Sequence, residues 1–228
     1  MELKKNNLAV QKFVQKGNVF MIVTGRVFES IYTEFVEFDL KANYISCAEA
    51  NVLFNSNFEL LYYSSISKED ILKIQDYYKL FDKIVGKDPY GNVSSDNIVE
   101  YHIRYKDEKS KDIFVKNLRH ANLFTFYHDP NDPLSAHLFN KRNDKVKAIQ
   151  TIATLEHIAH DEIYTVGDGY NDLKMIEAFN GFAIRNAKDA VKYESLGIYE
   201  TVSDLIKEIE TENVSKRLWK KLINKCVL

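Results

Sequence analysis

The sequence predicts an α/β fold in which a doubly wound, Rossmann-like parallel sheet forms the core and an α+β segment is inserted into it. Two observations carry this prediction. A helical pattern, an unbroken apolar run and a second helical pattern follow one another near the N-terminus, and the same order returns from Lys145 onward. Between these two regions the apolar residues alternate and pair, which is typical of antiparallel strands.

Length and composition limit the class of protein. The chain has 228 residues, of which 45% are apolar and 28% charged, so it can bury a core in one large domain or two small ones. Its net charge of -2 gives no overall attraction to nucleic acid or to an anionic membrane. No stretch reaches the roughly 18 to 20 consecutive apolar residues of a membrane span, and the N-terminus has no signal-peptide core. We therefore expect a cytoplasmic protein with neither a nucleic-acid nor a membrane partner, and the composition indicates no particular oligomeric state.

The N-terminal elements follow from the spacing of apolar residues. Residues 3–14 show partial helical spacing, and Gly17 stands where a glycine commonly ends a helix. Residues 19–23 form an apolar run of strand length, and helical spacing returns over residues 28–35. The polar turn at residues 24–26 joins this strand to this helix.

The middle of the chain predicts an inserted α+β domain. Residues 52–54 and 60–63 flank a turn signal and predict a hairpin, and a capping sequence at residues 67–70 predicts a helix over about 71–81. We further expect strands at 98–105, 123–128 and 136–139 and a helix at 111–119. The predicted domains are an α/β core at 1–56 and 142–228 and an α+β domain at 57–141.

The C-terminal part returns to the α/β pattern. We expect a helix over residues 145–158, a strand at 163–166 that breaks at Gly167, and a further strand at 181–184. Polar loops at the ends of such strands lie along one edge of a doubly wound sheet, which is where these folds bind ligands. A basic amphipathic stretch at 216–221 favours a solvated final helix.

The most specific motif is Val-Gly-Asp-Gly-Tyr-Asn-Asp-Leu at residues 166–173. Its carboxylates Asp168 and Asp172 are four residues apart, and a glycine on either side of Asp168 allows a tight turn that aims both at one point. Mg²⁺ accepts one or two carboxylates together with water and phosphate oxygens, so the pattern indicates a magnesium site. One alternative is an acidic turn with Asp172 in the first turn of a helix. The other is a dinucleotide-binding fingerprint, in which Asp172 would replace the third glycine and repel a pyrophosphate.

Two further segments could bind phosphate. Thr24-Gly25-Arg26 offers a hydroxyl, backbone N–H groups and a guanidinium at the start of a helix. Lys145 begins the helix that follows the inserted domain. The alternatives are an N-cap threonine with a surface arginine, and a solvated lysine.

The order of these segments resembles that of the haloacid dehalogenase-like (HAD) phosphatases, and most closely the Cof-like branch with its large α/β cap. Residues 21–26 resemble the second family motif, Lys145 the third and residues 167–172 the fourth. Residues 181–187 resemble a further family stretch in which Arg185 replaces a usual glycine. The resemblance spans roughly residues 8–210.

The resemblance implies a magnesium-dependent phosphatase acting on small phosphorylated metabolites, such as sugar phosphates or flavin precursors. Thr24 would hydrogen-bond the transferring phosphoryl group and Lys145 would neutralise its charge, and these two residues are the expected catalytic side chains. The expected phosphate-binding residues are Thr24, Gly25, Arg26, Lys145 and Asn171.

The resemblance also implies that Asp168 binds Mg²⁺ and that Asp172 supports or shares the metal. The inserted domain would be a cap that covers the pocket and selects the substrate. One departure concerns residues 49–50, Glu-Ala, where the family usually carries Asn-Gly.

A larger departure concerns the catalytic carboxylates. The family begins with an Asp-x-Asp motif, whose first aspartate attacks phosphorus and whose second acts as general acid and base. Residues 1–228 contain no such pair, and the family strand that carries it lies between the strands expected at 19–23 and 163–166. We therefore expect this chain to be impaired, as a shortened chain, a late start or a degenerate relative. The alternative is a non-catalytic HAD-like protein that binds a phosphate ligand or has a structural role.

Overall fold

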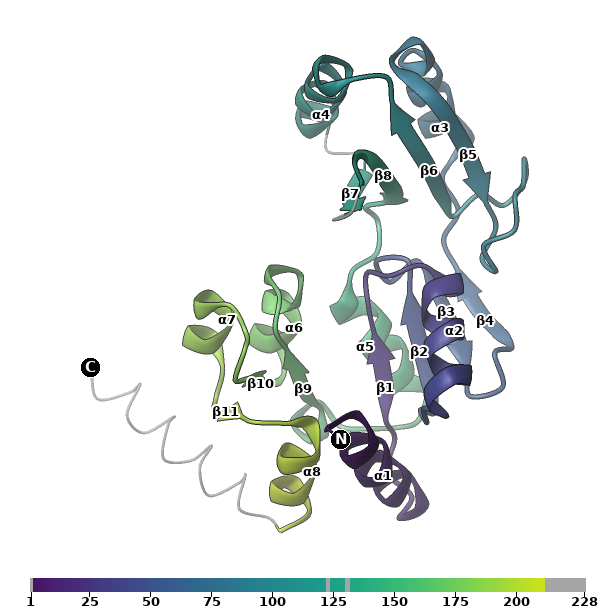
Figure 1. The fold of residues 1–228 in the computed structure, drawn as a ribbon. Helices are drawn as coiled ribbons and strands as arrows, with labels where there is room; N and C mark the ends of the chain where they lie inside the picture. Colours follow the sequence, from purple (N-terminus) through teal and green to yellow (C-terminus); the bar gives the residue numbers. More distant parts are fainter. Residues whose placement is uncertain (1, 122–123, 130–131, 212–228) are drawn as a thin grey trace. The chain divides into compact units, whose positions relative to one another are not determined.

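The computed structural model describes residues 2–121, 124–129 and 132–211 (Figure 1). The chain forms two compact units. Unit 1 comprises residues 1–21, 35–43 and 149–228, and unit 2 comprises residues 22–34 and 44–148. The sequence analysis instead divides the chain into a core at 1–56 and 142–228 and an α+β domain at 57–141, and these domain boundaries stay a prediction. The final helix expected at 216–221 lies outside the described residues.

Unit 1 contains a parallel three-stranded sheet in the order β11-β10-β9. The strands are β9 (Tyr164–Gly167), β10 (Asn180–Ile184) and β11 (Ile198–Tyr199). Helices α6 (Leu173–Ala178) and α7 (Asp189–Glu194) connect them, and short 3₁₀ turns precede β9 (His160–Glu162) and α6 (Tyr170–Asp172). Parallel strands joined through helices are the expected α/β architecture, so the predicted fold class is confirmed.

Two helices complete unit 1. Helix α1 (Glu2–Gln15) lies beside α8 (Val202–Glu210) (Figure 1). Lys5 Nζ lies 3.1 Å from Asp204 Oδ1, and the Asn6 side-chain oxygen accepts the Ser203 N–H at 3.0 Å. Gly17 follows α1 with a φ of 88°, a left-handed conformation that favours glycine, so the predicted helix end is confirmed.

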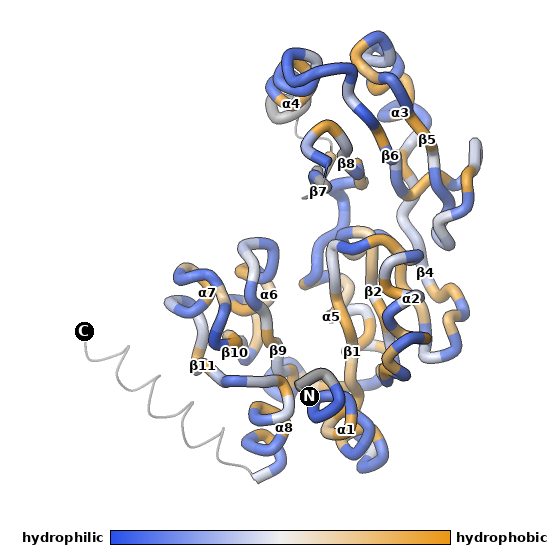
Figure 2. Tube along the Cα trace, viewed as in Figure 1, coloured by the Kyte–Doolittle hydropathy of each residue, from blue (hydrophilic) through white to orange (hydrophobic). Residues whose placement is uncertain are grey.

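Unit 2 contains two four-stranded sheets, and the first has the order β1-β2-β3-β4. Its strands are β1 (Met21–Val23), β2 (Tyr44–Cys47), β3 (Val52–Asn55) and β4 (Leu60–Tyr63), of which the last three are antiparallel. Apolar residues run along β1 and β2, as the orange segments of Figure 2 show. Helix α2 (Phe28–Phe38) packs on this sheet with the Phe28 ring 4.8 Å from that of Phe54.

The second sheet of unit 2 is antiparallel, in the order β5-β6-β8-β7. Its strands are β5 (Phe81–Lys87), β6 (Glu100–Tyr105), β7 (Phe124–Asp129) and β8 (Asp132–Asn140). Helices α3 (Lys68–Gln75) and α4 (Glu108–Ala121) join one buried cluster with alternate residues of these strands, including Ile74, Ile103, Phe114 and Leu138. Helix α5 (Lys145–Leu155) then leads the chain back into unit 1. Within the described residues, no helix is long and apolar enough to span a bilayer.

The helix predicted over residues 71–81 is wrong in its second half. Helix α3 ends at Gln75, a 3₁₀ turn covers Tyr78–Leu80, and Phe81 begins β5. The Phe81 ring packs 4.8 Å from that of Phe114. Tertiary packing of this aromatic side chain therefore overrides the helical spacing seen in the sequence.

Candidate functional site

The loop between β9 and α6 is organised by one of its own carboxylates. Asp172 is 5% exposed, and its Oδ2 accepts the N–H groups of Asp168 at 3.0 Å and Gly169 at 2.9 Å. Asp168, by contrast, is exposed at the carboxyl end of β9. Asp172 therefore shapes the loop from within, and Asp168 is presented to solvent.

The two glycines of this loop both lie close to side chains, but only Gly167 is required by space, because the side chain that faces Gly169 can move aside. A Cβ on Gly167 would lie 2.5 Å from the Asp172 Cβ, and a Cβ on Gly169 would lie 2.7 Å from the Asn171 side-chain oxygen. Both distances are shorter than Cβ atoms tolerate. The glycines thus permit the close approach of Asp172 and Asn171 to the backbone of the loop.

The segment after β10 adjoins the same loop. Gly167 pairs with Ala183 in the parallel ladder, and the Lys188 N–H donates to the Asp168 carbonyl at 2.9 Å. The exposed Arg185 forms an ion pair with Glu200. The family-like stretch 181–187 and Lys188 directly after it therefore support the backbone of the Asp168 loop.

The loop between β1 and α2 is held by a neighbouring strand. The Thr24 N–H donates to the Ser46 carbonyl at 2.9 Å, and Thr24 Oγ1 accepts the Arg26 N–H at 3.2 Å. Gly25 is buried. The hydrogen bond from the Arg26 N–H makes the Thr24 hydroxyl a local cap for the loop. The position of Thr24 at the carboxyl end of β1 also suits phosphate binding.

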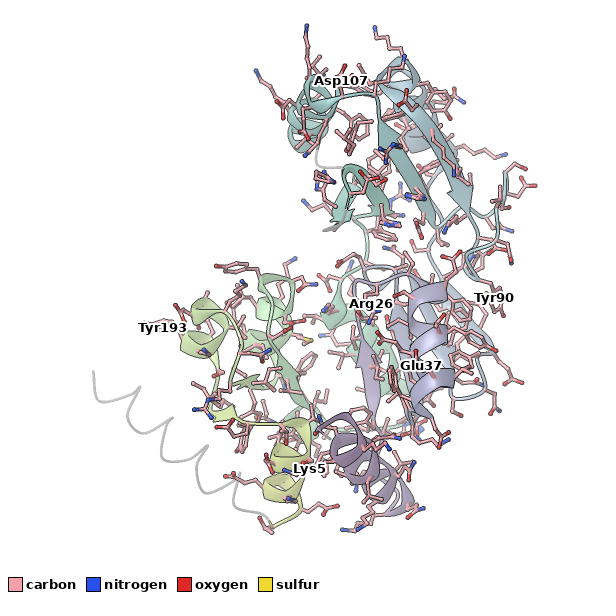
Figure 3. All side chains as sticks on the ribbon, in the orientation of Figure 1. Lys5, Arg26, Glu37, Tyr90, Asp107 and Tyr193 are labelled. Carbon is pink, nitrogen blue, oxygen red and sulfur yellow. The ribbon has the colours of Figure 1, made fainter. Side chains whose placement is uncertain are left out.

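The Arg26 side chain lies along α2 (Figure 3). Its guanidinium donates to Ser30 Oγ at 2.6 and 3.1 Å and lies 2.8 Å from Glu34 Oε2. A role of Arg26 in phosphate binding stays a prediction, since this guanidinium would have to exchange protein partners for the ligand.

Lys145 is the first residue of α5 and is only 7% exposed. Lysine is rarely buried unless its ammonium group is paired, so the alternative of an ordinary solvated lysine does not hold. A buried ammonium at a helix start is suited to meeting an anion.

The predicted site residues fall into both units. Thr24, Gly25, Arg26 and Lys145 belong to unit 2, and Asp168, Asn171 and Asp172 belong to unit 1. Their convergence around one phosphate, which the sequence led us to expect, stays a prediction.

Sequence reasoning attached no structural role to the turn that supports the Thr24 loop. Ala48, Glu49 and Ala50 all have positive φ values of 53°, 51° and 65°. The Ala48 N–H donates to the Arg26 carbonyl at 2.7 Å, and Asn51 Nδ2 donates to the Ala48 carbonyl at 2.9 Å. The usual Asn-Gly of the family, two residue types that tolerate this conformation, was the signal that could have identified this turn.

The residues present fit only part of a magnesium shell. No three His, Cys, Asp or Glu side chains gather into a metal-binding group within the described ranges. Asp168 is an exposed carboxylate on a loop that Asp172 closes, so it can serve as one ligand, and Mg²⁺ commonly completes its octahedron with water and phosphate oxygens.

The fold and these loops define an α/β protein with candidate phosphate-binding residues in unit 2 and a candidate metal-binding loop in unit 1. The sequence model of the haloacid dehalogenase-like hydrolases matches residues 2–85 and 82–204. The chain therefore belongs to this family, and within it to the Cof-like hydrolases. No curated protein sequence matches the chain.

Solved structures share the fold at low identity. A HAD/COF-like hydrolase from Plasmodium vivax is 18% identical with a TM-score of 0.72, covering 91% of this chain and 88% of that chain. A protein from Thermotoga maritima is 16% identical with a TM-score of 0.73, covering 90% and 89%. A HAD phosphatase from Bacteroides thetaiotaomicron is 17% identical with a TM-score of 0.69, covering 92% and 87%.

Proposed function

We propose that this chain derives from a magnesium-dependent phosphatase of small phosphorylated metabolites and that it keeps the phosphate-binding part of that site. The observation that carries the proposal is the Gly167–Asp172 loop. The chain belongs to this hydrolase family, and in this loop the buried carboxylate of Asp172 accepts backbone hydrogen bonds that hold the loop together. The second carboxylate, Asp168, is exposed at the carboxyl end of a parallel strand, where α/β sheets bind ligands.

Each site residue has a role in this proposal. Thr24 and the backbone of its loop hydrogen-bond the phosphoryl group, and the buried Lys145 neutralises its charge. Asp168 holds Mg²⁺, Asp172 keeps Asp168 in place, and Asn171 shapes the loop. When bound, the metal would supply charge neutralisation at the phosphate oxygens.

The missing nucleophile limits what this chain can do alone. Residues 1–228 hold no Asp-x-Asp pair, and phosphoryl transfer through an aspartyl phosphate requires an attacking carboxylate. We infer that the 228-residue chain binds phosphate but turns over substrate at most residually. The missing Asp-x-Asp pair also favours the second candidate function, which is a non-catalytic phosphate-binding protein.

Two measurements test the proposal. Calorimetric titration with inorganic phosphate in the presence of Mg²⁺ should detect binding, and Lys145→Met should weaken it at least about tenfold, because a charge-assisted contact contributes roughly 1.5–3 kcal/mol. Lys116→Met, at an exposed position of α4, is the matched control. Absence of phosphate binding by the unmodified chain would overturn the proposal.

The second measurement concerns turnover. Hydrolysis of an aryl phosphate by the 228-residue chain should stay near background, whereas a chain extended through any Asp-x-Asp encoded in frame upstream should turn over with Mg²⁺. Full magnesium-dependent turnover by the 228-residue chain, abolished by Asp168→Ala, would contradict our assignment of the nucleophile and require another carboxylate.

A further inference from the structure

The two sheets of unit 2 are connected by two chain crossings that contact each other. The first crossing, residues 64–67, runs from β4 to α3, and the second, residues 141–144, runs from β8 to α5. Asn140, the last residue of β8, is 3% exposed, and its Nδ2 donates to Ser64 Oγ at 3.2 Å and to the Ser65 carbonyl at 3.0 Å. A buried amide at the end of the second sheet therefore ties one crossing to the other.

Asn51 ties the same place to the first sheet. It directly precedes β3 and is buried. Its Nδ2 donates to the Asn140 carbonyl at 3.0 Å, and its own carbonyl accepts the Ser64 N–H at 2.8 Å. We call these contacts of Asn51, Ser64 and Asn140 the crossing clamp. Separating these groups would leave buried donors and acceptors without partners, which is costly, so the clamp keeps both crossings together.

A turn of the second sheet contacts helix α2 at a different point. Lys87, the last residue of β5, places its Nζ 2.8 and 3.0 Å from the two carboxylate oxygens of Glu29 in the first turn of α2. Gly91 approaches the same side chain, because a Cβ on Gly91 would lie 2.6 Å from the Glu29 Cδ. Its φ of 83° is a left-handed conformation that favours glycine. The turn therefore lies directly against α2.

The turn is closed by its own aspartate and carries an aromatic side chain. Asp88 Oδ1 accepts the Tyr90 N–H at 2.8 Å. The Tyr90 ring lies beside α2 (Figure 3), with its centroid 5.6 Å from that of Phe28 and 5.3 Å from that of the buried Phe54. We call residues 87–92 the strap. The strap thus joins the second sheet to both α2 and β3.

The crossing clamp and the strap are separate attachments. Asn51 and Phe54 are three residues apart, which corresponds to about 10 Å along an extended strand. On the second sheet, Lys87 pairs with Glu100 and Glu100 pairs with Phe139, so the two attachments lie at one end of the sheet, two strands or about 10 Å apart. The crossing clamp alone would be a pivot between the sheets, whereas a second attachment at this distance prevents rotation about it.

We propose that the strap locks the β5-β6-β8-β7 sheet to the β1-β2-β3-β4 sheet, so that the two sheets open and unfold as one body. The crossing clamp is the junction of this body, and the strap keeps it from bending there. Helix α2 begins at Phe28, two residues after Arg26, so the Thr24 loop belongs to the same body. The lock is a conformational device of unit 2 and does not require a bound phosphate.

Native-state hydrogen exchange of the 228-residue chain, followed by NMR at low urea concentrations, tests this lock, because the exchange rates report the opening of each sheet. Ile103→Val removes part of a side chain that is 0% exposed in the buried cluster of the second sheet. In a locked body this loss is shared by both sheets. We therefore expect the slowest-exchanging amides of β6 and β8 and those of β2 and β3 to accelerate by the same factor, about fivefold.

Breaking the strap should stop this transmission. In the Lys87→Met/Tyr90→Ala background, Ile103→Val should still accelerate exchange in β6 and β8 about fivefold, but by less than about twofold in β2 and β3. Lys87→Arg/Tyr90→Phe keeps a cation and an aromatic ring, so it should preserve the common factor. Lys83→Met, at an exposed position of the same strand, is the matched control for the loss of a charge.

Three results would overturn the inference. Acceleration confined to β6 and β8 in the chain with an intact strap would mean that the two sheets open independently. Full transmission in Lys87→Met/Tyr90→Ala would mean that the strap is not the lock. Loss of transmission in Lys83→Met would mean that charge rather than the strap couples the sheets. None of these results depends on phosphate binding, so the proposed function is tested separately.

Discussion

Two loops of this molecule lie between a strand and a helix, and they reach their shape in opposite ways. The Gly167–Asp172 loop is closed by its own side chain, because Asp172 Oδ2 accepts two N–H groups of the same loop. The Thr24 loop depends on a distant segment, because the backbone of residues 46–48 bonds both Thr24 and Arg26. A loop that is closed locally can be recognised in a sequence, and a loop closed by tertiary contacts is recognised far less readily.

Removing the carboxylate of Asp172 should give the largest effect. Asp172→Ala leaves two part-buried backbone N–H groups without their charged acceptor, so we expect the free energy of unfolding to fall by about 2 kcal/mol. Asp172→Asn keeps a carbonyl oxygen and should lose about half as much. Urea titration of the 228-residue chain measures both values, with the exposed Glu177→Ala as control. A loss below about 0.5 kcal/mol in Asp172→Ala would refute local closure of the loop.

The second largest loss of stability should follow from adding a methyl group at a glycine of this loop, and its size depends on which glycine is replaced. A Cβ at Gly167 meets the Cβ and Cγ of Asp172, whereas a Cβ at Gly169 mainly meets the end of the Asn171 side chain, which is exposed and can rotate away. We expect Gly167→Ala to cost somewhat less than Asp172→Ala, and Gly169→Ala to cost less than about 1 kcal/mol. Circular dichroism during thermal unfolding compares them directly, and an equal cost for both would argue against a specific contact at Gly167.

The comparison of the loops also explains which elements the sequence could predict. Strands β1, β9 and β10 are short apolar runs between polar turns, and the sequence located each of them within about two residues, the usual uncertainty of such boundaries. Strand β5 was missed because Asp82, Lys83 and Gly86 interrupt its apolar residues. Its place in the sheet comes from pairing with β6, which local patterns do not report.

Side-chain contacts also differ in whether a local sequence motif can predict them. Asp168 and Asp172 were identified from a string of six residues, and the structure assigns Asp172 a clear local role. Glu100 and His137 are 37 positions apart and meet only because β6 and β8 are neighbours in the sheet. No spacing rule connects such residues, so this contact could not be predicted from the sequence.

The smallest expected effect comes from the partly exposed start of α8, which is also closed by its own side chains. At the start of α8, Thr201 Oγ1 accepts the Asp204 N–H at 3.3 Å and donates to Asp204 Oδ2 at 2.7 Å. The hydrogen bond from Thr201 and the contact with Lys5 lower the pKa of Asp204. Because the folded-state pKa lies below the unfolded value of about 3.9, this stabilisation is present above that pH and is lost as the pH falls through the folded pKa.

Asp204→Ala should therefore lower the free energy of unfolding by less than about 1 kcal/mol at pH 7, since solvent screens the interactions of a partly exposed carboxylate. The difference from the unmodified chain should shrink when the same urea titration is repeated below about pH 4. Glu177→Ala, measured at both pH values, corrects for the general loss of a negative charge. If Asp204→Ala and Asp172→Ala lowered the free energy of unfolding equally, burial would not be what distinguishes the two carboxylates. If the loss in Asp204→Ala grew on acidification, the pH dependence would have the opposite sign to the one derived from the lowered pKa of Asp204.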